Sequence, residues 1–150
     1  MDNDFHKSIG SWQMNQSELS IYNSILQNPG STACNAPNAF YFAKNTIDPK
    51  RLADAILKVI GNHKSFCCNA GGDVSNPHMI CNKRLLHRDI IPVKKVNENE
   101  ITALLSAFVK PFDLHNDILF RVGMFETDSR YYVITDFSQL IFDGFSYKIF

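Results

Sequence analysis

The most restrictive feature of the sequence is a pair of apolar runs separated by one short polar turn. The first run, residues 118–127, places Phe120 and Val122 at alternate positions. The turn DSR follows, and the second run covers residues 131–142. Alternation with a period of two is typical of a strand with one buried face. Two such runs across a short turn predict a long β-hairpin, whose apolar face requires a covering layer.

The segment DPKRLADAILKVIGNH predicts an amphipathic helix that could supply this cover. Asp48 can cap the helix and Pro49 suits its first position. Gly61 suits the C-terminal stop. Apolar residues recur along the segment at helical spacing and leave its charged residues available to water.

Shorter elements fill the rest of the chain. A second helix is expected after Asn97, because Glu100 three residues on completes a capping box. The other expected elements are a helix over 14–27, a strand over 36–43, a hairpin from strands 65–70 and 78–82, and the start of a further helix in the final GFSYKIF. This order of helices and hairpins predicts an α/β (α+β) two-layer sandwich.

Composition favours a single folded domain. The chain has 150 residues, of which 45% are hydrophobic, so it can bury a core. Residues 1–13 are interpreted as a lead-in segment and residues 14–150 as the domain. Fifteen basic residues balance fifteen acidic ones, which gives no support for a nucleic acid or membrane partner. Neither a signal core nor a membrane-spanning apolar stretch is present, so a cytoplasmic protein is expected.

The four cysteines do not suggest a metal site. Cys67 and Cys68 are neighbours, which would point to opposite faces of a strand, and the others are Cys34 and Cys81. No C-x-x-C spacing or matching histidine pair accompanies them. We therefore expect four small buried thiols, with no metal and no bound cofactor.

Four segments of the chain belong together as a series of motifs. They are STACNAPNAFYF at 31–42, IDPKRLADAILKVIGNHKSF at 47–66, PFDL at 111–114 with Leu119-Phe120-Arg121, and SQLIFDG at 138–144. In this order and spacing they resemble the N-terminal half of a nonribosomal peptide synthetase condensation domain. That family belongs to the chloramphenicol-acetyltransferase-like acyltransferases. The resemblance implies half of such a fold, with a mixed sheet packed against helices.

The resemblance also implies a function and a site. Condensation domains join two carrier-tethered thioester substrates through an amide bond, at a loop that reads H-H-x-x-x-D-G. Here Ser138 occupies the first histidine position and Gln139 the second, while Asp143 and Gly144 remain. The aspartate is mainly structural in the family and pairs with an arginine, whose position is occupied by Cys67. Arg121 belongs to the supporting L-F-R motif.

The residue at the second histidine position decides how the site is interpreted. A glutamine can hydrogen-bond an amine or a carbonyl, but it cannot accept a proton. One interpretation is an active site in which Gln139 only positions the amine; the other, which we favour, is an impaired site. The alternative function is a non-catalytic module that binds carrier proteins or recruits a tailoring partner.

The resemblance finally implies partners. Carrier proteins would supply the phosphopantetheine arm, and a C-terminal subdomain or a second copy of the chain would complete the domain. A fragment of a larger synthetase, a stand-alone short protein and a truncated remnant all fit the sequence, although an end within a predicted helix favours a fragment.

Overall fold

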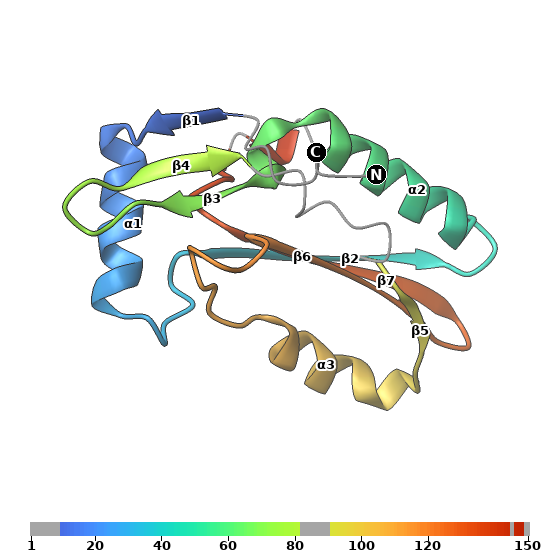
Figure 1. The fold of residues 1–150 in the computed structure, drawn as a ribbon. Helices are drawn as coiled ribbons and strands as arrows, with labels where there is room; N and C mark the ends of the chain where they lie inside the picture. The colour runs from blue at the N-terminus through green and yellow to red at the C-terminus, as the bar shows by residue number, and fades with distance from the viewer. Residues whose placement is uncertain (1–9, 82–90, 145, 149–150) are drawn as a thin grey trace, which may run out of the picture.

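The computed structural model of the chain describes residues 10–81, 91–144 and 146–148. Within them, two β-sheets and three α-helices form the fold (Figure 1). The elements in chain order are β1 (Gly10–Gln13), α1 (Gln16–Gln27), β2 (Asn35–Ala43), α2 (Pro49–Asn62), β3 (Cys68–Gly71), β4 (His78–Cys81), β5 (Val93–Lys95), α3 (Ile101–Phe108), β6 (Phe120–Glu126) and β7 (Arg130–Ser138). Short 3₁₀ turns occupy Lys64–Cys67, Glu98–Glu100 and Ser146–Lys148.

The larger sheet has four strands in the order β2-β7-β6-β5. The predicted long hairpin is its centre, because β6 and β7 pair antiparallel from Phe120 opposite Phe137 onwards. On the outer edges, β2 pairs antiparallel with β7 and β5 pairs parallel with β6. The smaller sheet has the order β1-β4-β3 and is antiparallel throughout. The predicted α/β class, a mixed sheet packed with helices, is confirmed, but helices lie on both faces of the larger sheet rather than in the single covering layer of the predicted two-layer sandwich.

Helices cover both faces of the larger sheet, α2 on one side and α3 on the other (Figure 1). On the first face, Ile60 of α2 belongs to the same buried cluster as Phe137 of β7. On the second face, Ile101 of α3 packs with Phe125 of β6. Both faces of the central strands are therefore covered, which explains why twelve of the sixteen residues of β6 and β7 are buried.

The N-terminus of α2 forms as its sequence predicts. The side chain of Asp48 accepts hydrogen bonds from the backbone N–H groups of Lys50 at 2.9 Å and Arg51 at 3.2 Å. The predicted C-terminal stop at Gly61 is wrong, since the helix continues through Asn62 and is capped by His63. Gly61 keeps a negative φ, so it does not adopt the left-handed conformation by which glycine ends a helix.

The capping box before α3 is also confirmed. The Asn97 side chain accepts from the backbone of Glu100, and the Glu100 side chain accepts from the Asn97 N–H at 2.8 Å. The turn that it caps is a 3₁₀ turn, which continues directly into α3.

Several other predicted boundaries also differ from the structure. Residues 10–13, assigned to the lead-in, form β1, whose side chains are all exposed and so show no alternation. The strand predicted over 65–70 begins only at Cys68, because the buried residues before it form a 3₁₀ turn. The strand predicted over 131–142 ends at Ser138, and the apolar residues beyond it belong to a loop.

Some expectations concern residues outside the described ranges. They include the lead-in over 1–9 and the end of the strand predicted over 78–82. Of the helix expected in the last residues, the described part is the 3₁₀ turn Ser146–Lys148. Among the described residues, no helix has both the length and the apolar character needed to cross a membrane.

The expectation of four unpaired thiols is wrong for two of the cysteines. Cys68 and Cys81 lie opposite each other in the β3–β4 pair and form a disulfide. They are 13 residues apart in the sequence, and only the register of the two strands brings them together. Cys67 is buried and Cys34 is partly buried.

Candidate functional site

The segment 138–144 begins where the central strand β7 ends. Ser138 is fully buried, and its backbone N–H donates to the Leu119 carbonyl at 2.9 Å. Gln139 is exposed, while its backbone N–H donates to the Cys34 carbonyl at 2.9 Å. The backbone at the first two motif positions is thus held by residues next to β2 and β6, while the Gln139 side chain faces solvent.

Two apolar side chains fix the middle of this loop to the core. Leu140 and Phe142 are 4% and 3% exposed. The Phe142 ring stacks on Phe137 with a centroid distance of 4.0 Å and an interplanar angle of 12°. The loop therefore combines buried apolar anchors with an exposed amide at Gln139.

The Asp-Gly pair forms a turn after these anchors. The Asp143 carboxylate accepts from the backbone N–H of Ser146 at 2.9 Å and from its hydroxyl at 2.6 Å. Both Asp143 and Gly144 are exposed. The Asp143 carboxylate is thus engaged with its own turn, as aspartates that precede glycine in turns commonly are.

The remaining two site residues lie on other elements. Cys67, at the position of the expected arginine, is 4% exposed and belongs to the core cluster beneath the smaller sheet. Arg121 lies on β6 directly opposite Asp136 of β7, and its Nη1 is 2.9 Å from that carboxylate. The structure thus brings Ser138, Gln139 and the Asp-Gly turn into one loop and leaves Cys67 in the core.

Arg121 is held by a buried carboxylate, that of Asp136, which was not predicted from the sequence. The Asp136 side chain has no solvent exposure, and Asn35 of β2 also donates to it, at 2.9 Å and 3.1 Å. A signal was present, because an aspartate stands within the apolar run YYVITDF. A charged residue at a strand position buried on both faces requires a partner.

Histidines do not assemble a catalytic group in the described ranges. His115 approaches the Tyr22 hydroxyl at 3.3 Å with Nε2 and the Ala70 carbonyl at 3.1 Å with Nδ1. These contacts join α1, β3 and the loop before β6, which is a packing role. Nor does any group of three His, Cys, Asp or Glu side chains in those ranges suit a metal ion.

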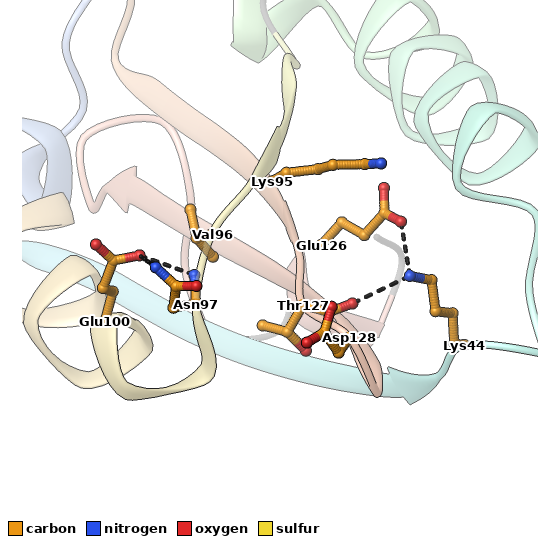
Figure 2. Close-up of a pocket in the computed structure, with 8 residues that line it drawn as sticks. All are labelled: Lys44, Lys95, Val96, Asn97, Glu100, Glu126, Thr127 and Asp128. Carbon is orange, nitrogen blue, oxygen red and sulfur yellow. Dashed lines mark hydrogen bonds and ion pairs between the residues drawn. The ribbon is translucent and has the colours of Figure 1, made fainter.

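A polar cavity of about 270 Å³ is a competing site, and Figure 2 shows its lining. It lies where β2, β5 and β6 end, and its main interaction is an ion pair between Lys44 and Glu126 at 2.9 Å. The hydrogen bond from Lys44 lowers the pKa of Glu126, and the same bond raises the pKa of Lys44. The one hydroxyl of this lining, that of Thr127, is 3.2 Å from the Arg130 carbonyl. Because these charges neutralise each other, the motif loop remains the better candidate.

Comparison with known proteins gives one consistent result. A model of the condensation domain family matches residues 20–150. Tyrocidine synthase 2 of Brevibacillus parabrevis is 30% identical over 139 residues, which are 89% of this chain and 4% of that protein. Gramicidin S synthase 2 of Aneurinibacillus migulanus is 30% identical over 120 residues, which are 77% of this chain and 2% of that protein. The chain thus spans a few per cent of the curated relatives it matches.

The fold is similar to that of solved condensation domains. A mutant of the starter condensation domain of rhizomide synthetase superimposes with a TM-score of 0.77. The match covers 92% of this chain and 33% of that one, at 12% sequence identity. At this identity the similarity shows the fold alone.

Proposed function

This chain belongs to the condensation domain family and corresponds to its N-terminal half, and we propose that it presents the motif loop of a nonribosomal peptide synthetase. The reaction of that domain would be amide formation between carrier-tethered acyl and aminoacyl thioesters. Carrier proteins would bring both substrates on phosphopantetheine arms, in the cytoplasm. A C-terminal half, or a second copy of this chain, would close the substrate channel.

We further propose that catalysis by this half is impaired. The observation that carries this proposal is the exposed amide of Gln139 on a loop whose backbone and apolar anchors are well formed. An attacking ammonium must lose a proton, and neither the Gln139 amide nor the buried Ser138 hydroxyl can take it up near neutral pH. Gln139 could still hold an amine or a carbonyl in place, so slow aminolysis of an activated thioester remains compatible with this site.

The second candidate function is a binding module without turnover. Two residues together favour a binding module. The amide of Gln139 cannot accept a proton, and Cys67 stands at the position where an arginine is expected. Such a module would dock a carrier protein, or recruit a tailoring partner, through the surface around the motif loop. Both candidate functions require binding of a carrier protein, but only the first forms an amide product.

Carrier binding is therefore the first test. We expect a phosphopantetheinylated carrier protein to bind the chain more tightly than its unmodified form, measured by isothermal titration calorimetry. Gln139→Trp should weaken this binding by about tenfold or more, because a bulky indole would block the loop surface. The matched substitution Gln27→Trp, on the exposed end of α1, should leave it unchanged. Equal affinity for both carrier forms, or no effect of Gln139→Trp, would contradict the proposal.

A further inference from the structure

Asp136 is a fully buried carboxylate two residues before the motif loop. It lies on β7 and receives hydrogen bonds from the Arg121 guanidinium on β6 and the Asn35 amide on β2. Burial raises the pKa of Asp136, whereas the hydrogen bond from Asn35 and the charge of Arg121 act in the opposite direction. Three neighbouring strands are thus joined by one polar cluster, Asn35–Arg121–Asp136, at the end of the sheet where the motif begins.

The same cluster also holds the chain that leads into β6. Arg121 donates through Nη1 to the Lys110 carbonyl at 2.7 Å and through Nη2 to the Pro111 carbonyl at 2.8 Å. Its guanidinium carbon stands 3.7 Å from the centroid of the Phe112 ring. Asn35 donates to the Lys110 carbonyl as well, at 2.9 Å. A planar fork with five donors suits this many fixed acceptors, and a lysine could not make the same set.

The backbone partners of the motif loop adjoin the residues of this cluster. The N–H of Ser138 is bonded to the carbonyl of Leu119, two residues before Arg121. The N–H of Gln139 is bonded to the carbonyl of Cys34, one residue before Asn35. Any movement of β2 or β6 relative to β7 would therefore change the position of the exposed Gln139 amide.

A contribution to the stability of the fold is by itself a weak explanation for the presence of such a cluster. A buried ion pair of this kind is often no more stabilising than apolar residues of similar volume, because desolvation of both charges offsets their attraction. What the cluster does specify is geometry, since its donors and acceptors fit in one arrangement of three strands and one loop.

We propose that Asn35, Arg121 and Asp136 are positioning residues, which couple the 110–112 segment to the motif loop 138–144. The functional meaning of this coupling rests on the proposed function. The coupling itself is a property of the chain without ligands and can be measured without a carrier protein.

Amide hydrogen exchange of the ligand-free chain tests the coupling. Arg121→Lys keeps the charge but loses the fork, and Asp136→Asn removes the charge but keeps the shape. In both variants we expect amides in 138–144, where five backbone N–H groups are hydrogen-bonded, to exchange about tenfold faster or more. Amides in α2 should keep their wild-type rates. Glu126→Gln, which breaks the Lys44 ion pair at the other end of β6, is the matched control and should leave 138–144 unchanged.

Two results would overturn the proposal. One is unchanged exchange in 138–144 in a folded Arg121→Lys variant, which would mean that the loop does not depend on the cluster. The other is equal acceleration in α2 and in the loop, which would mean that the cluster only stabilises the whole fold. If Asp136→Asn fails to fold by circular dichroism, Arg121→Lys decides alone. Accelerated loop exchange in a chain that binds no carrier would uphold this inference and contradict the proposed function.

Discussion

Phe137→Ala is expected to lower the free energy of unfolding by about 3–5 kcal/mol, as large-to-small substitutions in a packed core do. Phe137 has no exposed surface and lies immediately before the motif loop. Its ring stacks on Phe142 and also contacts Phe66 and Phe120, with centroid distances of 5.7 Å and 6.5 Å. Removing it would leave a cavity beneath the loop and take away the surface on which Phe142 rests.

Urea denaturation of the two proteins measures this loss, and Phe40→Ala is the matched control. Phe40 lies on β2 of the same sheet but is 43% exposed, so the same substitution should cost less than half as much. Equal losses for the two variants would show that Phe137 is not the anchor that seats the motif loop on the core.

Gln139→His is expected to raise the rate of amide formation by about a hundredfold or more in a complete condensation domain assembled from this half and a C-terminal half. A neutral imidazole can accept the proton of the attacking ammonium, and a positioned general base contributes about 10²–10⁴ to rate. The exposed side chain of Gln139 leaves room for the ring. Mass spectrometry of the carrier-bound product measures the rate, and Gln27→His on the exposed end of α1 controls for the histidine itself.

Absence of any gain in a folded Gln139→His variant would mean that the lesion extends beyond one residue. Ser138, at the expected position of the first histidine, and Cys67, at the expected position of the arginine, are then the next positions to restore. Cys67 lies in the core, so an arginine there would have to displace packed apolar residues, which is expected to be costly.

Local patterns predicted those parts of the fold that depend on local contacts. The caps at Asp48 and Asn97 work through side chains that bond to backbone two or three residues away, so spacing alone reveals them. The central hairpin was recognisable because its first strand alternates in sequence and the two apolar runs lie on either side of one short turn. The second strand was predicted to be longer than it is, because Leu140 and Phe142 are buried in a loop and resemble strand residues in the sequence.

Contacts between distant segments could not be read in the same way. β5 has three exposed residues and exists because β6 lies beside it. The bond between Cys68 and Cys81 follows from the register of β3 and β4. The cluster around Asp136 joins residues up to 101 positions apart, and only the arrangement of three strands brings them together.

In the candidate site, too, some features could be predicted from the sequence and others could not. The motif positions Ser138 and Gln139 were assigned by resemblance, and the structure adds that the first is buried while the second is exposed. The resemblance could not indicate which residues support Ser138 and Gln139, because Arg121 acts through the carboxylate of Asp136 on the neighbouring strand.

We propose that the motif loop of this half is well formed but has no proton acceptor at either of the two histidine positions, Ser138 and Gln139. The most direct measurement is the rate of amide formation by the domain that contains it, with loaded carriers on both sides. We predict a rate close to that of uncatalysed aminolysis, unchanged by Gln139→Ala. Rapid amide formation that Gln139→Ala abolishes would contradict the account and make Gln139 a catalytic residue.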